Sequence, residues 1–189
     1  MLVLLCALAI QLGCGSDSEP GQAFGTIEVP DMQLAYLDGS KAKLSDLEGK
    51  VVLLNFWATW CPPCREELPH FEDLHKAYRD EGLAIVGVSM DQAGADHVRS
   101  FSNDVGISYP IAMGAFEDME KIWSQVEDIP TITGYGSEAP VAASGTVQMM
   151  PTTFVIDRTG RIYQKHVGPR DRAALEPTLR KLMGMTGAS

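Results

Sequence analysis

Cys61 and Cys64 are the residues of this 189-residue sequence whose type and spacing most directly indicate chemistry. They follow the apolar run VVLLNFW and precede an amphipathic segment, so they fall where a buried strand passes into a helix. The unpaired N–H groups and the positive dipole end at a helix start favour a thiolate over a thiol. A second cysteine one turn later lies on the same face and can close a disulfide. The spacing predicts Cys61 as the attacking thiolate and Cys64 as the resolving thiol.

A zinc site is an alternative use of these cysteines, because His70 and His75 would complete a set of four ligands. In a helix that advances about 100° per residue, the two histidines would point about 140° apart. Neither would face the cysteines, and the spacing is not that of a zinc finger. We therefore expect no metal and no cofactor other than a redox-active Cys61–Cys64 disulfide, with both histidines on the helix surface.

Alternating strands and helices must position the cysteines. The run 51–57 is typical of a strand buried on both faces, and a helix should extend from the cysteines to about residue 79. A second buried strand over 83–90 would complete a βαβ unit with two parallel strands. The other expected elements are a hairpin over 32–44, helices over 95–105 and 116–126, a hairpin made of 152–157 and 161–167, and a last helix over 171–183. Pro177 should kink that last helix or delay its start.

The segment from Glu127 to Met150 is rich in Gly, Ala, Ser and Thr and shows no clear period. An irregular loop of this length is uncommon inside a compact domain and is often functional. Because it leads directly into Met150, we hypothesise that an irregular insertion near 127–149 forms a flap that shapes partner choice. A mobile surface loop is the alternative.

The amino-terminal residues predict export. The first twelve are almost wholly apolar, too few to cross a bilayer as a helix but suited to the apolar region of a signal peptide. No Lys or Arg precedes Lys41, which suggests that the true signal begins further upstream. We expect a signal peptide over 1–13, a flexible tether over 14–25 and one domain over 26–185.

The stretch QLGCGS places a small residue and then Cys14 directly after the apolar run, and it resembles the lipobox of bacterial lipoproteins. The resemblance implies a lipid on Cys14 and a chain anchored to a membrane in the periplasm or on the cell surface. Gln11 stands where the pattern usually has Leu, so an ordinary signal peptide with an incidental cysteine is the alternative. With Cys6 inside the signal, the folded domain keeps one close cysteine pair and no structural disulfide framework.

The stretch VVLLNFWATWCPPCREELP resembles the active-site segment of the thioredoxin superfamily, in its membrane-tethered TlpA/ResA-like branch. The resemblance runs over about 32–183, apart from the irregular segment. It implies an α/β, thioredoxin-like fold with a mixed central sheet flanked by helices, extended here by an N-terminal β-hairpin. It also implies that Trp60 and Pro62, beside the first cysteine, contact the substrate, and that Pro69 is the proline that kinks the helix.

A second stretch, MMPTTFVIDRTGRI, resembles the cis-proline loop of the same family. It implies that Pro151 is cis and lies beside the disulfide. There it would keep the backbone open to an extended substrate strand, with Met150 at the contact edge. Pro130 is the other candidate, but no strand and Asp-x-x-Gly turn follow it.

The proton acceptor is also implied by the resemblance. Thioredoxins proper keep a buried Asp six residues before the first cysteine, where this chain has Asn55, which cannot take a proton. The ResA-like branch instead carries an acid three residues after the second cysteine, here Glu67. One turn beyond Cys64, Glu67 would exchange protons with the resolving thiol, provided that burial raises its pKa. The alternative is a solvent-facing glutamate like Glu66.

The resemblance implies a thiol–disulfide oxidoreductase: a monomer that reduces exported protein disulfides, apocytochrome c included, with electrons from a membrane donor. A peroxiredoxin-like peroxidase is one alternative, but it needs a Pro and a Thr where this chain has Trp57 and Ala58. A copper(I)- or haem-handling module would use both thiolates as soft ligands. Copper-delivery relatives, however, separate their cysteines by three residues. A net charge of -10 argues against nucleic acid as a partner.

Overall fold

The computed structural model describes residues 28–115, 131–133 and 150–185. The expected signal peptide and tether, the helix over 116–126 and most of the insertion lie outside these residues, so those expectations stay predictions. Pro130 also lies outside them.

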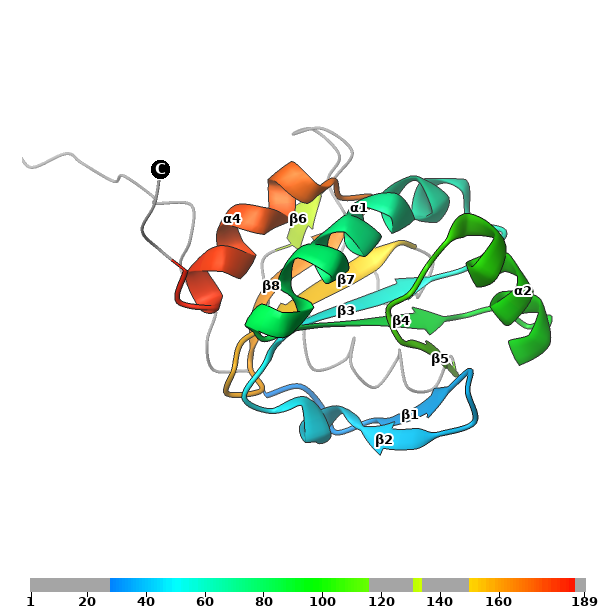
Figure 1. Ribbon diagram of the computed structural model, residues 1–189, viewed down its shortest axis with the longest axis horizontal. Coiled ribbons are helices and arrows are strands. Elements are labelled where there is room, and N and C mark those ends of the chain that lie inside the picture. The colour runs from blue at the N-terminus through cyan, green and yellow to red at the C-terminus, as the bar shows by residue number, and fades with distance from the viewer. Residues whose placement is uncertain (1–27, 116–130, 134–149, 186–189) are drawn as a thin grey trace, which may run out of the picture.

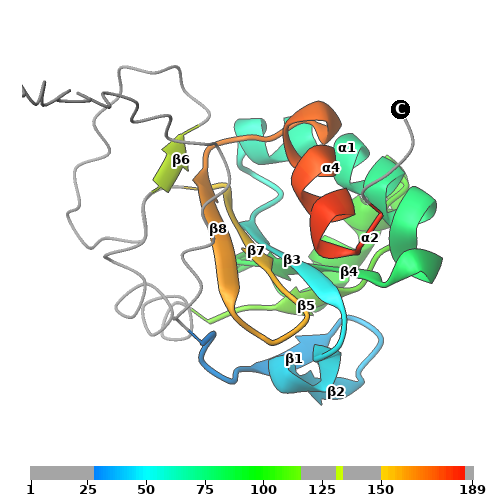
Figure 2. The same cartoon turned by 90° about the vertical axis from the view of Figure 1, so that its left-hand side faces the viewer.

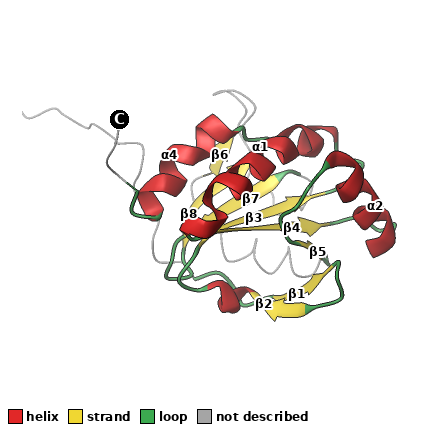
Figure 3. Ribbon diagram, in the orientation of Figure 1, coloured by secondary structure: helices red, strands yellow, loops and turns green. Residues whose placement is uncertain are grey.

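The described strands form one mixed sheet of eight, in the order β2-β1-β5-β4-β3-β7-β8-β6 (Figure 1). The strands are β1 (Gln33–Tyr36), β2 (Lys41–Lys43), β3 (Val51–Trp57), β4 (Leu83–Ser89), β5 (Ile111–Met113), β6 (Thr131–Thr133), β7 (Thr152–Ile156) and β8 (Ile162–Val167). The helices are α1 (Pro62–Tyr78), α2 (Ala95–Val105) and α4 (Arg172–Leu182), with 3-10 turns η1 (Leu44–Leu47) and η2 (Arg79–Glu81). Figure 3 colours these elements by type. The mixed sheet, the flanking helices and the N-terminal hairpin agree with the thioredoxin-like fold expected from the sequence.

β3 lies near the centre of the sheet, and all of its residues are buried, as its apolar composition predicts. It pairs in parallel with β4 over its whole length, with Trp57 opposite Ser89, so both strands end at the same edge of the sheet. On its other side it pairs antiparallel with β7, with Phe56 opposite Thr152. The end of β3 therefore lies beside the start of β7, although the two are far apart in the sequence.

α1 starts directly after Cys61, which is its N-cap residue. Pro62 and Pro63 occupy the first two positions of the helix, where a missing N–H is tolerated because it has no partner within the helix. Pro69 lies inside the helix on its exposed side. Four side chains at helical spacing on the inner side of α1 are buried; they are Leu68, Phe71, Leu74 and Tyr78.

The three described helices cover one face of the sheet (Figures 1 and 2). One hydrophobic cluster joins this face to them, with Val98 from α2 and Leu175 from α4. The Tyr78 hydroxyl of α1 also donates a hydrogen bond to Glu176 of α4. A second cluster lies on the opposite face, where the N-terminal hairpin and η1 contribute Met32, Leu34 and Leu44. No described helix is long and apolar enough to cross a membrane.

One expectation was wrong in detail. Residues 131–133, assigned to the irregular insertion, form β6, which pairs in parallel with the edge of β8 (Figure 2). A three-residue strand is too short to show a period of two, so its pairing partner rather than its own sequence identifies it. Pro177 lies inside α4 and does not delay its start, since the helix already begins at Arg172 behind the side-chain cap of Asp171. The kink, the other expected effect of Pro177, stays a prediction.

Candidate redox site

Cys61 and Cys64 form a disulfide at the start of α1, with their Cα atoms 5.3 Å apart. The Cys61 sulfur also accepts a hydrogen bond from the backbone N–H of Cys64, at 3.3 Å. Residues 58–60 connect β3 to this helix start, so the pair lies at the edge of the sheet where β3 and β4 end. Cys61 keeps 5% of its surface exposed and Cys64 none, which leaves Cys61 as the sulfur that a partner can approach.

The surface beside Cys61 is apolar and hollowed. The Trp60 side chain is 62% exposed, and Pro62 is exposed next to it. A cavity of about 350 Å³ lies beside Trp60; its lining residues are Thr59, Trp60, Met90, Asp91, Gln92, Ala93 and His97. An exposed indole next to a hollow is the type of surface that receives a partner's side chains.

The Met150–Pro151 peptide bond is cis, the state expected of Pro151. Pro151 precedes the first residue of β7, which places it beside the end of β3 and the loop that carries Cys61. Its carbonyl oxygen accepts a hydrogen bond from the N–H of Gly168, at 2.9 Å. Met150 is half-buried and packs against the hydrophobic cluster that contains both cysteines. The segment that carries Cys61 and the Met150–Pro151 loop, both selected from the sequence, are therefore neighbours in the fold.

Glu67 lies on the inner face of α1, with 1% of its surface exposed, whereas Glu66 is exposed. Its Oε1 accepts a hydrogen bond from Asn55 Nδ2 at 2.7 Å, and its Oε2 accepts one from the backbone N–H of Arg170 at 3.2 Å. Asn55 therefore donates to the acid. From the sequence, Asn55 was predicted only to be unable to accept a proton; its contact with Glu67 joins β3 to α1 and leaves no local sequence pattern.

Burial raises the pKa of Glu67 from 4.5 to about 8, because the charged form loses its hydration. The hydrogen bonds from Asn55 and Arg170 and the positive charge of Arg170 lower this pKa, but by less than burial raises it. The carboxyl group is therefore mostly protonated at pH 7. Proton exchange by Glu67 was expected on the condition that burial raises its pKa, and burial raises it here.

His166 on β8 lies opposite Thr153 on β7, near the same buried acid. The Thr153 hydroxyl accepts the second hydrogen bond from Asn55 Nδ2, at 3.0 Å. Burial, and then the charge of Arg170, lower the pKa of His166 to about 3. The imidazole is therefore neutral at physiological pH and does not exchange protons there, whereas Glu67 titrates close to neutrality.

A polar network that was not predicted from the sequence holds the loop before Cys61. Asp91, at the end of β4, is buried and accepts hydrogen bonds from the Thr59 backbone N–H at 2.9 Å and from the Ser89 hydroxyl at 2.8 Å. The Thr59 hydroxyl donates to the same carboxylate and lies 3.1 Å from His97 Nε2. The available signal was the position of Asp91: parallel strands end at one edge of a sheet, so a polar residue just after β4 must lie near the end of β3.

The histidines considered as zinc ligands lie elsewhere. Both are half-buried, and His75 packs edge-on against Tyr109, with ring centres 6.1 Å apart. Across the described residues, no group of three or more His, Cys, Asp and Glu side chains is arranged to hold a metal ion.

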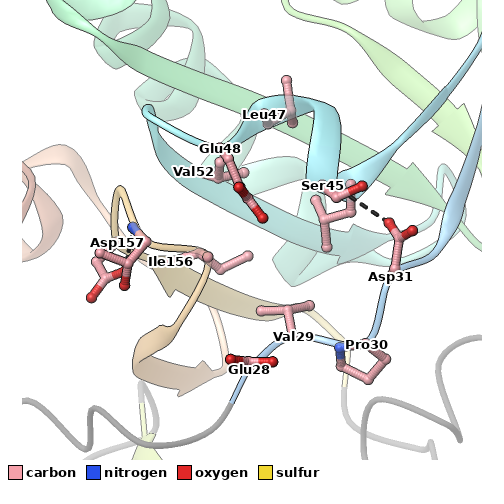
Figure 4. Close-up of a pocket in the computed structure, with 13 residues that line it drawn as sticks. Glu28, Val29, Pro30, Asp31, Ser45, Leu47, Glu48, Val52, Ile156 and Asp157 are labelled. Atoms are coloured by element: carbon pink, nitrogen blue, oxygen red, sulfur yellow. Dashed lines mark hydrogen bonds between the residues drawn. The ribbon is translucent and has the colours of Figure 1, made fainter.

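A larger cavity, of about 420 Å³, lies at the opposite end of β3 (Figure 4). Its floor includes Val52 and Ile156, and its rim carries four carboxylates; they belong to Glu28, Asp31, Glu48 and Asp157. Asp31 accepts a hydrogen bond from the Ser45 N–H and pairs with Lys43. This cavity contains no cysteine and no residue of the redox site.

Comparisons with known proteins agree with this geometry. Residues 26–165 match the AhpC/TSA family. The thiol-disulfide oxidoreductase ResA of Bacillus thuringiensis (strain Al Hakam) is 32% identical over 155 residues, which cover 82% of this chain and 76% of the relative. The thioredoxin-like protein YneN of Bacillus subtilis (strain 168) is 34% identical over 154 residues, or 80% of this chain and 76% of the relative.

Among solved structures, the fold is similar to that of a thiol:disulfide interchange protein of the thioredoxin family from Chlorobium tepidum TLS. The TM-score is 0.66 at 28% identity, over 84% of this chain and 97% of that one. With a family match over more than half of its length and ResA among its relatives, the chain belongs to the AhpC/TSA family of thioredoxin-like proteins.

Proposed function

We propose that the chain is a thiol–disulfide oxidoreductase that exchanges its Cys61–Cys64 disulfide with the disulfides and dithiols of other proteins. The observation that carries this proposal is a closed disulfide at a helix start, with one reachable sulfur and a buried carboxyl one turn away. The names of the relatives, ResA thiol-disulfide oxidoreductase among them, support the same reaction class.

Reduction of a partner begins at Cys61. In the dithiol form, its thiolate, favoured by the helix start, attacks one sulfur of the partner disulfide. The partner S–S bond breaks, a Cys61–partner disulfide forms, and the other partner sulfur leaves as a thiolate that takes a proton from water. Buried Cys64 is not exposed to other thiols, so it serves the next, internal step.

Resolution then needs a base next to Cys64. The Glu67 carboxylate takes the Cys64 proton, and the Cys64 thiolate attacks the Cys61 sulfur. This forms the Cys61–Cys64 bond, breaks the mixed disulfide and releases the second partner thiolate, so two electrons pass from the enzyme to the partner. When a donor later reduces the enzyme, Cys64 leaves as a thiolate and Glu67 returns the proton. A pKa of about 8 suits an acid that must both take and return a proton near neutral pH.

Partner binding is assigned to the apolar surface around the disulfide. Trp60 and Pro62 are exposed on one side of Cys61, and the Met150–Pro151 segment lies beside the end of β3. An extended partner segment laid between them would bring its sulfur to Cys61. The hollow beside Trp60 would receive a neighbouring side chain.

The direction of electron flow is proposed to be reductive, with exported proteins such as apocytochrome c as substrates and a membrane protein as donor. The midpoint potential of the Cys61–Cys64 couple tests this. A value near ~-270 mV supports a reductant, and a value near ~-120 mV would indicate an oxidant.

Export with a lipid on Cys14 is proposed from the amino-terminal sequence alone. Mass spectrometry of the protein from membrane fractions should find diacylglyceryl on Cys14 at the mature amino terminus. Cys14→Ser should move the protein from the membrane to the soluble fraction. An unmodified Cys14 in membrane-bound protein would refute the anchor without affecting the redox proposal.

An insulin-reduction assay with a dithiol donor tests the activity itself. Wild type should turn over, Cys61→Ser should not, and Cys64→Ser should accumulate a mixed disulfide because the resolving thiol is missing. Peroxide consumption or stoichiometric copper(I) binding by wild type, with no disulfide turnover, would overturn the proposal in favour of a peroxidase or a metal-handling module.

A further inference from the structure

A three-residue segment between β8 and α4 makes hydrogen bonds to two parts of the redox site. The backbone N–H of Gly168 donates to the carbonyl oxygen of Pro151, at 2.9 Å. Two residues later, the backbone N–H of Arg170 donates to Glu67 Oε2, at 3.2 Å. The segment 168–170 therefore joins the loop that is assigned to partner binding to the buried acid that is assigned to proton transfer.

The residue types of this segment account for the direction of both N–H groups. β8 pairs with β7 as far as Val167, and Gly168 continues the pairing by one hydrogen bond. Gly168 then has a φ of 91°, a left-handed conformation in which a residue with a Cβ is strained. Pro169 has no N–H, and its ring holds its own φ at about -65°. The chain thus leaves the sheet with little freedom, and its next N–H donor is that of Arg170.

Arg170 acts on the acid through its side chain as well as through its backbone. Burial raises the pKa of Glu67, and the opposing influences are the hydrogen bond from Asn55, the Arg170 N–H and the Arg170 charge. Burial lowers the pKa of Arg170 itself, and the charge of Glu67 opposes that change in turn. The half-buried guanidinium and the buried carboxyl therefore lie close enough to interact.

Three other titratable groups lie around the Glu67 carboxyl. Cys64, one turn earlier on α1, is bonded to the other cysteine in the oxidised chain and does not titrate. Burial raises the pKa of Tyr109, before β5, well above its ordinary value, and burial lowers that of His166, on β8, to about 3. Of these four groups, Glu67 is the one that titrates close to neutral pH, so its titration reports changes in the segment.

We propose that the segment 168–170 positions Glu67 for proton transfer: it fixes the carboxyl relative to the partner-binding loop and favours the ionised form that takes the Cys64 proton. This inference rests on the proposed function. The proton passes from the Cys64 sulfur to the Glu67 carboxylate, and the Cys64 thiolate then attacks the Cys61 sulfur. Arg170 neither gains nor loses a proton, so it is a positioning residue.

Arg170→Gln isolates the charge, because it removes the guanidinium and keeps the backbone N–H. In the oxidised chain labelled with ¹³C-glutamate, the titration midpoint of Glu67 should rise by about half a pH unit. Arg170→Lys keeps a positive charge and should stay closer to wild type. Arg172→Gln is the matched control, because its carboxylate partner is Glu176, and should leave the midpoint unchanged. An unchanged midpoint in Arg170→Gln would overturn the proposal.

Gly168→Ala tests the backbone, because a Cβ at this φ should displace the segment and weaken the hydrogen bond to Glu67. Gly106→Ala is the control for strain alone: Gly106 ends α2 with a φ of 77°, and a Cβ there meets nothing within 4 Å. Both variants should unfold at lower urea concentration, and Gly168→Ala alone should raise the Glu67 midpoint. Equal midpoints in the two variants would overturn the proposal. The Arg170 variants decide the question even if Gly168→Ala does not fold.

The pH dependence of mixed-disulfide resolution separates this inference from the proposed function. Because resolution needs the Glu67 carboxylate, its rate in Arg170→Gln should rise at a higher pH than in wild type, by the same shift as the titration. Stopped-flow kinetics over the pH range measures the profile. A shifted titration with an unshifted rate profile would uphold the effect of the segment on Glu67 and refute proton transfer by Glu67.

Discussion

At one end of β3, Glu67 is buried beneath α1, and at the other end Asp31 lies on the rim of the cavity in Figure 4. Burial raises the pKa of Glu67 to about 8. At the rim, the backbone hydrogen bond from Ser45 is the largest influence on Asp31 and lowers its pKa. The same chemical group is thus held mostly protonated at one end of the strand and ionised at the other.

The comparison teaches that burial, rather than residue type, creates the reactive acid. The hydrogen bonds that Glu67 accepts from Asn55 and from the Arg170 N–H do not offset the loss of hydration. The four rim carboxylates keep contact with solvent and form an acidic surface feature. Changes at the two ends of β3 should therefore have different consequences.

The largest expected effect is that of Glu67→Gln on disulfide turnover. Glutamine keeps the shape of the side chain but cannot take the Cys64 proton, so resolution of the mixed disulfide should slow by about 100-fold or more. Stopped-flow kinetics of this step measures the effect. Glu66→Gln is the matched control, one position away on the exposed side, and should change the rate little. Equal rates for both variants would refute a proton-transfer role for Glu67.

The second effect concerns the pH dependence of stability. The folded-state pKa of Glu67, about 8, lies above its ordinary value of 4.5, so between these pH values the folded protein holds a proton that the unfolded chain releases. The stabilising contribution is fully present below pH 4.5 and is lost as the pH rises through 8, for a total of a few kcal/mol. Urea unfolding at pH 5 and pH 8 should show this loss in wild type and a smaller loss in Glu67→Gln. Identical losses in the two proteins would contradict it.

A smaller effect is expected for the network before Cys61. Asp91→Ala leaves the Thr59 N–H buried without its acceptor, which should lower the free energy of unfolding by about 1–3 kcal/mol. Asp96→Ala, on the exposed side of α2, is the control and should lower it less. Urea unfolding at one pH compares the two. Equal losses would show that the buried contacts of Asp91 contribute no more to the free energy of unfolding than the surface contact of Asp96.

The smallest effect is expected at the rim. Asp31→Asn should leave insulin reduction unchanged, because Asp31 lies at the far end of β3 from the cysteines. Its lowered pKa implies a stabilising contribution that is present at neutral pH and lost as the pH falls. Acid unfolding of Asp31→Asn and of wild type tests this contribution. As the pH falls, wild type should lose more stability than the variant. A marked fall in turnover would show that the two ends of β3 are coupled.

Local sequence signals were sufficient for the main elements and the disulfide. The apolar run of β3, the cysteines beside Pro62 and the pattern of α1 each depend on neighbours in the sequence, and the structure reproduces them. The family resemblance supplied the cis state of Pro151. β6 was missed because three residues are identified as a strand only by their partner β8.

The side-chain contacts inside the site could not be predicted from the sequence. Asn55 and Glu67 are separated by a strand end, a loop and a helix turn, so their hydrogen bond is not a sequence pattern. The contacts of Asp91 with Thr59 likewise join two strand ends. The sequence could nominate Glu67 and state that burial was needed. Only the packing of α1 on β3 determines that Glu67 is buried while Glu66 is not.

The most direct test of the account is a carboxyl-carbon NMR titration of Glu67 in the oxidised protein, labelled with ¹³C-glutamate and assigned with Glu67→Gln. We expect a midpoint near pH 8, the value for an acid that burial keeps protonated beside Cys64. A midpoint near 4.5 would show an ordinary, solvated carboxylate, and the proposed proton exchange with the resolving thiol would be contradicted.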